Sequence, residues 1–187
     1  SDVCSSDLSR IAILSVNHAQ APVSVRERVA FEPNHLADEL QKLNSISGVE
    51  ACVILSTCNR SEIYTVVDND NPQEILSQYL SDTHQVSRQE LDSYLVYFEN
   101  DAALEHICNV ACGLDSLVLG EPQILGQLKD AYHSAKQAKT LDKKLEKLFQ
   151  HAFSTAKKVR TDTQIGSSPV SIAYCAVKLS EKIFADL

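Results

Sequence analysis

The sequence lacks any apolar run that approaches the roughly 18 residues needed to cross a bilayer. Its opening segment, SDVCSSDLSR, has neither a basic start nor an apolar stretch, so it is not a secretory signal. Internal repeats and low-complexity tracts are absent as well. These absences exclude a membrane-spanning protein and predict a cytoplasmic one. We interpret residues 1–9 as a polar leader that need not be native.

Glycine is also scarce, with five residues in a chain of 187, and none of them forms the Gly-rich turn of a dinucleotide-binding domain. Cysteine is better represented, because six residues would allow three disulfides by count alone. A chain with 44% hydrophobic residues forms a core without such crosslinks, so we expect free thiols in a reducing compartment. In that setting a cysteine in a polar turn is a candidate for chemistry, whereas one in an apolar run belongs to the core.

The net charge of −8 argues against indiscriminate binding of nucleic acids. The charge is unevenly distributed, however, because residues 136–160 hold eight Lys or Arg and only two acidic residues. The other 162 residues hold nine Lys or Arg and 23 acidic residues. A basic segment on an acidic protein marks a place where a polyanion docks, or is simply a solvated helix face. Charge alone leaves both interpretations open.

The spacing of apolar residues predicts both strands and helices. Strands are expected at residues 10–17, 50–56, 62–67 and 94–98. Helices are expected at 33–43 and 72–80, and then at 101–112, 122–138, 141–162 and 169–186. A loop with a short helical piece would fill residues 18–33. The order strand, helix, strand, strand, helix, strand fits an α+β fold, a ferredoxin-like split βαβ sandwich followed by C-terminal helices.

A polar turn, Thr57-Cys58-Asn59-Arg60, separates the two central predicted strands. Cys58 ends a buried strand, so the sheet would hold its backbone while its sulfur faces a cleft. Arg60 supplies a fixed positive charge that would favour the thiolate over the thiol. The residues leave two hypotheses open for Cys58, a nucleophile or a free cysteine in an ordinary hairpin. Cys52, which lies inside the apolar strand, is predicted to be core.

His106 is the best candidate for a base that partners Cys58. It lies on a predicted helix with Cys108 and Cys112, and this triple also raises the hypothesis of a structural zinc site. The two cysteines share a helix face, but His106 lies about 160° round the helix from Cys112. Because the three side chains do not converge, we predict no metal site. An unremarkable polar histidine is the alternative for His106.

The segment from Gly113 to Gln127 places polar side chains between glycines, and Pro122 suits the first turn of a helix. Such a segment would bind a small zwitterion through side chains and the free N–H groups of a helix N-terminus. A connector that caps its own helix is the alternative.

Four blocks of the sequence together resemble glutamyl-tRNA reductases. They are Asn17-His18 with residues 21–28, the run Ser56–Arg60, the segment Gly113–Gln127, and Lys158–Gly166. The blocks occur in order with compatible spacing, and the resemblance spans roughly residues 10–187. One five-letter motif would carry little weight, whereas four ordered blocks identify the chain as similar to this family.

The resemblance implies NADPH-dependent reduction of glutamyl-tRNA to glutamate-1-semialdehyde through a cysteinyl thioester. This reaction begins the five-carbon route to 5-aminolevulinate and the tetrapyrroles, including porphyrins. It implies that Cys58 is the nucleophile and His106 the acid/base assistant. The residues that would surround the glutamyl group are Thr57, Asn59, Arg60, Ser116, Glu121, Pro122, Gln123 and Gln127. Arg60 would pair with a carboxylate through its forked donors. The candidate tRNA contacts are Lys136, Lys139, Lys143, Lys144 and Lys147, extended by Lys157, Lys158 and Arg160.

On this basis we expect residues 10–160 to form the catalytic, glutamyl-tRNA-binding domain. Residues 161–187 would be a linker and the first helix of a Rossmann-type NADPH-binding domain that is truncated here. The chain alone would then form the thioester and act as a slow esterase. The full-length protein is expected to be a homodimer that channels its product to glutamate-1-semialdehyde aminomutase. The alternatives are a Cys–His hydrolase or acyltransferase and a non-catalytic tRNA-binding module.

Overall fold

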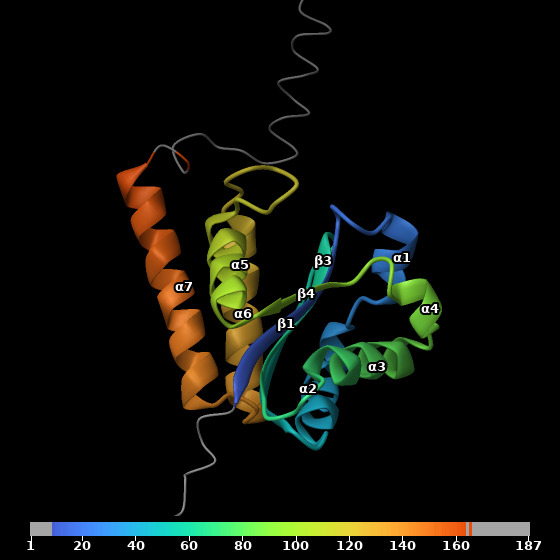
Figure 1. The fold of residues 1–187 in the computed structure, drawn as a ribbon. Coiled ribbons are helices and arrows are strands. Elements are labelled where there is room, and N and C mark those ends of the chain that lie inside the picture. Colours follow the sequence, from blue (N-terminus) through green and yellow to red (C-terminus); the bar gives the residue numbers. More distant parts are fainter. Residues whose placement is uncertain (1–8, 164, 166–187) are drawn as a thin grey trace, which may run out of the picture.

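The computed structural model describes residues 9–163 and 165, and it has an α+β architecture built on one antiparallel sheet (Figure 1). The strands lie in the order β2-β3-β1-β4. They comprise β1 (Arg10–Asn17), β2 (Val49–Ser56), β3 (Arg60–Val67) and β4 (Val96–Glu99). This is the strand order of the ferredoxin-like split βαβ sandwich, so the predicted fold class is confirmed.

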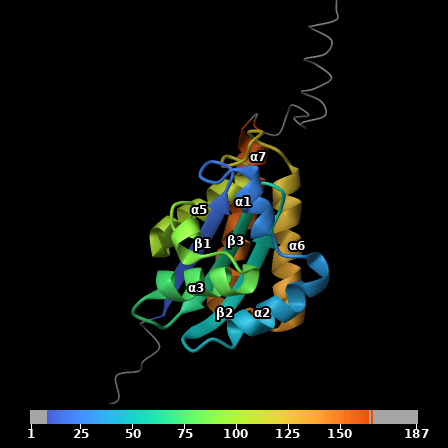
Figure 2. The same cartoon turned by 90° about the vertical axis from the view of Figure 1, so that its right-hand side faces the viewer.

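Helices cover both faces of the sheet (Figure 1). On one face lie α5 (Asn100–Cys112), α6 (Gln123–Ala138) and α7 (Lys143–Asp162). The opposite face carries α1 (Val23–Arg28), α3 (Pro72–His84) and α4 (Arg88–Leu91). A 3₁₀ turn, η2 (Pro33–His35), leads into α2 (Leu36–Asn44), which packs against β2 and α6 at the edge of the sheet (Figure 2).

The register of the sheet decides where the polar turn lies. Asn17 at the end of β1 pairs with Arg60 at the start of β3, and Ser56 at the end of β2 pairs with Ser61. The turn of residues 57–59 therefore lies at the end of the sheet at which β1 also ends. α6 begins at this same end of the molecule, and its last turn lies at the other end (Figure 1).

The observed elements follow the predicted ones with a few differences. β3 begins at Arg60, two residues earlier than predicted, because its first polar side chains are buried and bonded within the protein. The short helix α4 was not predicted, and the strand expected at 94–98 is β4 at 96–99. The helix predicted at 169–186 lies outside the described residues. None of the described helices has the length and apolar character needed to cross a bilayer.

Candidate active site

Cys58 lies at the exposed tip of the turn between β2 and β3. The turn is held by bonds within itself. The Thr57 amide donates to the Arg60 carbonyl at 2.8 Å, and Thr57 Oγ1 accepts from the amides of Asn59 at 3.2 Å and Arg60 at 3.1 Å. A threonine hydroxyl that accepts two backbone N–H groups stabilises a tight turn, which explains why this residue precedes Cys58.

Two residues from the beginning of the chain contact the turn from outside. The His18 amide donates to the Asn59 carbonyl at 2.9 Å. The Nη1 atom of Arg26, on α1, donates to the Cys58 carbonyl at 2.8 Å and to Asn59 Oδ1 at 3.0 Å. The sequence placed both residues in a recognisable block without assigning them a role. Contacts between residues more than 30 positions apart depend on the sheet register, so local patterns do not reveal them.

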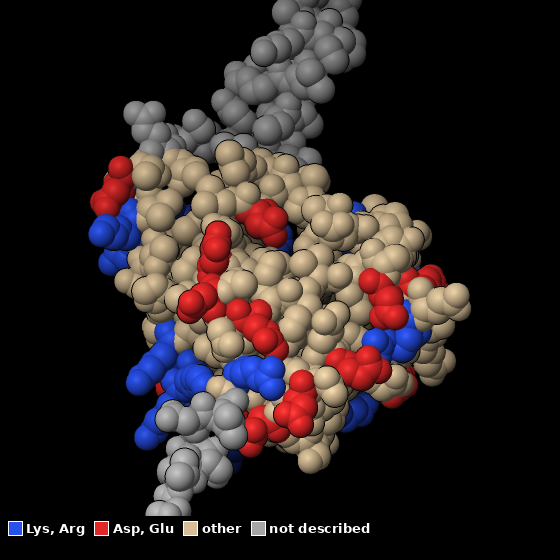
Figure 3. Space-filling view, viewed as in Figure 1, with Lys and Arg blue, Asp and Glu red and all other residues tan. Residues whose placement is uncertain are grey.

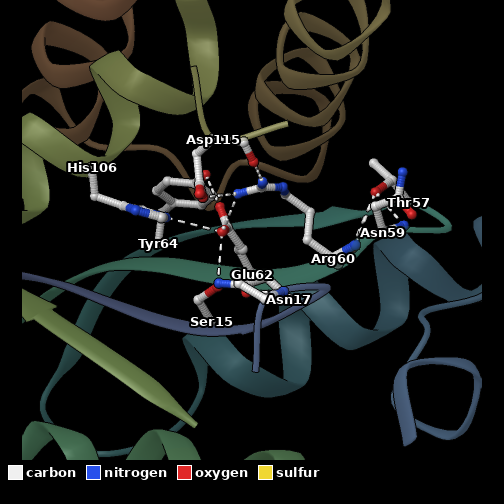
Figure 4. Close-up of polar contacts among 10 residues, drawn as sticks. Ser15, Asn17, Thr57, Asn59, Arg60, Glu62, Tyr64, His106 and Asp115 are labelled. Atoms are coloured by element: carbon white, nitrogen blue, oxygen red, sulfur yellow. Dashed lines mark hydrogen bonds and ion pairs between the residues drawn. The ribbon is translucent and has the colours of Figure 1, made fainter. Parts of the chain in front are cut away.

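Behind the turn, Arg60 is almost fully buried, and its side chain points away from Thr57 and Asn59 toward Asp115 (Figure 4). Its Nη1 contacts Glu62 Oε1 at 2.9 Å and Asp115 Oδ2 at 3.0 Å, and its Nη2 donates to the Asp115 carbonyl. The sequence analysis expected the positive charge of Arg60 to favour the thiolate of Cys58. In the structure, the carboxylates of Glu62 and Asp115 balance that charge instead. The donors that were expected to bind a substrate carboxylate are likewise engaged inside the protein.

Glu62 is the centre of this buried network, and its carboxylate has no exposure to solvent. Oε1 accepts from Ser15 Oγ at 2.8 Å and contacts His106 Nε2 at 2.9 Å, while the Tyr64 hydroxyl donates to Oε2. Asn17 donates to Ser15 Oγ at 3.1 Å and so extends the network to the end of β1. These contacts satisfy a buried charge, which is otherwise very costly.

The network also decides the ionisation of Glu62. Burial by itself would raise its pKa, but the bond and charge of His106, the charge of Arg60 and the Tyr64 hydroxyl outweigh burial and lower the pKa to about 2. Burial and the neighbouring Glu62 carboxylate raise the pKa of Tyr64 well above its usual value. Glu62 is therefore a carboxylate and Tyr64 a neutral donor at neutral pH.

A cavity of about 90 Å³ opens beside the Cys58 turn. Cys58 lines it, together with seven of the eight residues predicted to surround the glutamyl group. The seven are Thr57, Asn59, Arg60, Ser116, Glu121, Gln123 and Gln127. Pro122 does not line the cavity and instead provides the N-cap of α6. Leu117 and Ile124 complete the wall with apolar groups.

Two glycines shape the loop that closes this cavity. Gly113 and Gly120 have φ of 74° and 77°, a region that favours glycine, and the Gly120 amide donates to the Gly113 carbonyl at 2.9 Å. A Cβ on Gly120 would lie 2.6 Å from the carbonyl oxygen of Ile165. The loop therefore needs glycine at position 120 for both its conformation and its space.

His106 does not face the same cavity as Cys58. It is buried, its ring stacks on Phe98 with 4.1 Å between centroids, and it lines a second cavity of about 400 Å³ with Asn17, Gln20, Asn109 and Asp115. The ion pair of Arg60 and Asp115 lies between the two cavities, since Arg60 lines the first and Asp115 the second. No contact joins His106 to Cys58 among the described residues, and its assignment as acid/base assistant stays a prediction.

The other described cysteines differ from Cys58 in their surroundings. Cys52 is fully buried, and burial raises its pKa to about 12, which confirms the prediction that it belongs to the core. Burial also raises the pKa values of Cys108 and Cys112 on α5. Cys58 alone among these four thiols is exposed.

The basic residues of the 136–160 segment lie toward the two ends of α7. Lys136, Lys139, Lys143, Lys144 and Lys147 are exposed around the junction of α6 and α7. Lys144 donates to the carbonyl of Ser9, just before β1, whereas Cys58 lies beyond the other end of β1. Eight residues of strand span about 26 Å. Figure 3 shows basic side chains gathered at this lower end of α7, and Arg160 at the upper end donates to the Glu121 carbonyl.

The Cys58 cavity by itself does not fit a nicotinamide dinucleotide. None of the described strands is followed by a Gly-rich turn that opens a helix, and the cavity at Cys58 is far below the roughly 300 Å³ at which pockets for larger ligands begin. The site is therefore suited to a small group that reaches a thiol.

Fold and site together define a ferredoxin-like α+β domain that presents one exposed cysteine beside a small polar cavity. The sequence profile described as "Glutamyl-tRNAGlu reductase, N-terminal domain" matches residues 14–163, and the chain belongs to this family. It is similar to the glutamyl-tRNA reductases of Vesicomyosocius okutanii, with 70% identity over 95% of the chain, and of Ruthia magnifica, with 68% identity over 96%.

The structure is also similar to that of the glutamyl-tRNA reductase from Methanopyrus kandleri. The TM-score is 0.72 at 29% sequence identity, and the match covers 92% of this chain and 39% of that one. The chain spans 42% and 43% of the lengths of the two sequence relatives. The similarity therefore concerns the N-terminal part of those proteins.

Proposed function

We propose that this chain is the part of a glutamyl-tRNA reductase that binds glutamyl-tRNA and forms a thioester at Cys58. The observation that carries the proposal is the convergence of residues distant in sequence, from the β2–β3 turn and from the 113–127 segment, on one cavity beside an exposed thiol. Membership of the family supplies the acyl group and its carrier.

The proposed chemistry is an acyl transfer. The Cys58 thiolate attacks the ester carbonyl carbon of glutamyl-tRNA, and the bond between that carbon and the ribose oxygen breaks. The ribose oxygen takes up a proton equivalent to the one that the Cys58 thiol lost, so the tRNA leaves as an alcohol. Sulfur suits this step because a thiolate is strongly nucleophilic and a thioester carbonyl is more electrophilic than an ester. In the whole protein, we assign the reduction to glutamate-1-semialdehyde with NADPH to the part of the relatives that extends beyond this chain.

The cavity supplies groups that match a glutamyl moiety. Glu121 is the carboxylate of its lining and suits an α-ammonium group, while the amides of Gln123 and Gln127 suit a carboxylate or carbonyl. The N-terminus of α6 begins at the same wall and favours negative charge. We assign the glutamyl group to this cavity on these grounds.

The remaining properties of the proposed enzyme follow from its family. It would act in the cytoplasm at the start of tetrapyrrole biosynthesis, as a homodimer that passes its product to an aminomutase. His106 would assist as acid or base. Because its Nε2 contacts Glu62, we assign this role to the other ring nitrogen.

The first test is a search for the covalent intermediate. The 187-residue chain is incubated with glutamyl-tRNA and its intact mass is measured. We expect a glutamyl adduct on the wild type, its slow release as free glutamate, and no adduct on Cys58→Ser. Cys108→Ser is the matched control because Cys108 is a half-buried thiol outside the cavity, and it should retain the adduct.

An adduct that survives Cys58→Ser would contradict the proposal. Two other outcomes identify the alternatives. A hydrolase or acyltransferase would acylate Cys58 from simple esters as readily as from glutamyl-tRNA. A non-catalytic tRNA-binding module would bind tRNA while Cys58 stays unreactive toward iodoacetamide at neutral pH.

A further inference from the structure

We propose that Arg26 is the positioning residue of the nucleophile, and that it holds the Cys58 peptide group in the orientation that aims the thiol into its cavity. This inference rests on the proposed function of Cys58. It assigns to α1, which contributes nothing to the lining of the cavity, a specific part in the reaction.

The bonding of the turn singles out Arg26. Thr57 and Arg60 are held by each other and by their strands, and Asn59 is held by Thr57 and by the His18 amide. Among the described residues, Cys58 has one polar contact, and it is the bond that its carbonyl accepts from Arg26 Nη1 at 2.8 Å. The same nitrogen binds Asn59 Oδ1 at 3.0 Å. One atom of Arg26 therefore binds both the carbonyl oxygen of Cys58 and the side chain of the next residue, Asn59.

The charges of the site point to the same residue. Arg60 is neutralised by Glu62 and Asp115, whereas Arg26 makes no ion pair within the described part of the chain. The Nε atom of Arg26 is buried and has no hydrogen-bond partner among the described residues. An unsatisfied buried donor lowers stability, so this arginine carries a local cost beside the two bonds that it makes to the turn. The guanidinium is therefore a cation that has no ion-pair partner among the described residues and that contacts the cysteine residue itself.

The base of Arg26 is itself well fixed. Its neighbour Val25 is buried in the core, and the Val25 and Arg26 amides both donate to the Pro22 carbonyl at 3.1 Å. The Ala21 amide donates to the Asn17 carbonyl at 2.9 Å, which ties the segment to the end of β1. A group on a fixed element holds a reacting atom more accurately than the turn would alone, and a displacement of about 1 Å costs on the order of a hundredfold in rate.

The test compares three variants of the 187-residue chain. Arg26→Gln removes the charge and shortens the donor, Arg26→Lys keeps a charge and one donor group, and Arg28→Gln is the control. Arg28 lies two residues on in the same helix, but its partner is Glu90 at the exposed surface. Adduct formation from glutamyl-tRNA is followed as a function of tRNA concentration, alongside thermal unfolding and alkylation of Cys58 by iodoacetamide.

We expect Arg26→Gln to lower the maximal rate of adduct formation by on the order of tenfold to a hundredfold. The half-saturating tRNA concentration should change by less than about twofold, and Arg26→Lys should recover part of the rate. Arg28→Gln should match the wild type. A purely structural role for Arg26 would lower the melting temperature and the number of reactive molecules instead, without a rate defect in the folded fraction.

The inference is overturned if folded Arg26→Gln forms the adduct at the rate of Arg28→Gln. It is also overturned if the defect lies wholly in the half-saturating concentration, since Arg26 would then bind tRNA. Absence of an adduct on the wild type would instead refute the proposed function, so the two failures are distinguishable.

Discussion

Glu62 shows at the scale of a single residue how this protein keeps a charge inside a sheet. It lies on β3 between Arg60 and Tyr64 on the same face, and it is a fully buried carboxylate in contact with both of them and with Ser15 and His106. Removal of one partner from a buried ion pair is strongly destabilising because the other charge is left without compensation. The network therefore fixes the positions of β1, β3 and α5 relative to one another.

We expect Glu62→Gln to lower the free energy of unfolding at pH 7 by about 3 kcal/mol, the cost of leaving Arg60 without its buried partner. The folded pKa of about 2 lies below the usual 4.5, so the stability that ionised Glu62 provides is complete above pH 4.5. It is lost as pH falls toward 2. Urea unfolding between pH 7 and pH 3 should show the gap between wild type and Glu62→Gln narrowing below pH 4.5. A difference in unfolding free energy between the two proteins that does not depend on pH would contradict an ionised Glu62.

At the scale of elements, the loop between α5 and α6 decides whether the cavity exists. Its glycines let the chain leave α5, pass close to Ile165 and enter α6. This path places Glu121, Gln123 and Gln127 in the lining of the cavity beside Cys58. Three large apolar side chains of this loop, Leu114, Leu117 and Leu119, are exposed. The loop is therefore held by its backbone geometry more than by burial of its own side chains.

Gly120→Ala should therefore disrupt the cavity, because the new Cβ would meet a backbone oxygen at 2.6 Å in a conformation with positive φ. We expect a loss of stability of about 1–3 kcal/mol and a clear loss of adduct formation. Gly126→Ala is the control, since no atom lies within 4 Å of its added Cβ and it is inside α6. That change should stabilise the helix by about 0.5–1 kcal/mol. Thermal melts and intact-mass assays check both, and equal behaviour of the two variants would refute the role given to Gly120.

At the scale of the whole molecule, the Cys58 site and the lysines at the α6–α7 junction lie apart. The lysines at the α6–α7 junction lie by the start of β1, about 26 Å from the turn that holds Cys58. A large polyanion that delivers its end to Cys58 would need to lie along the helices to reach them. These lysines are therefore suited to binding the body of such a polyanion, and they do not reach the reacting atoms at Cys58.

Charge reversal at Lys143 and Lys147 should weaken tRNA binding and reduce its salt dependence, by about 0.7–0.9 in slope for each phosphate that the variant no longer binds. The maximal rate of adduct formation should stay unchanged because both lysines are remote from the cavity. Lys42→Glu is the control, an exposed lysine on α2 outside the basic segment. Titrations at several salt concentrations measure the slope, and an unchanged slope would exclude this junction as a binding surface for tRNA.

Much of the fold was predictable from the sequence because strands and helices leave short-range patterns. Residues 10–17 alone predicted β1 to the residue, and the periodicity after residue 100 predicted α5, α6 and α7 to within two residues. The site was predictable in part for the same reason. Cys58 follows an apolar run, and its turn residues are adjacent in sequence.

The sequence by itself determined the order of the strands, the place of Cys58 in a turn and most of the polar residues that line its cavity. The tertiary structure alone decided that Arg60 turns inward to Asp115, that His106 contacts Glu62 and lines a separate cavity, and that Arg26 contacts the Cys58 carbonyl. These pairs are 55, 44 and 32 residues apart. The physical reason is that periodicity reports which face of its own element a side chain occupies, whereas its partner depends on sheet register and helix packing.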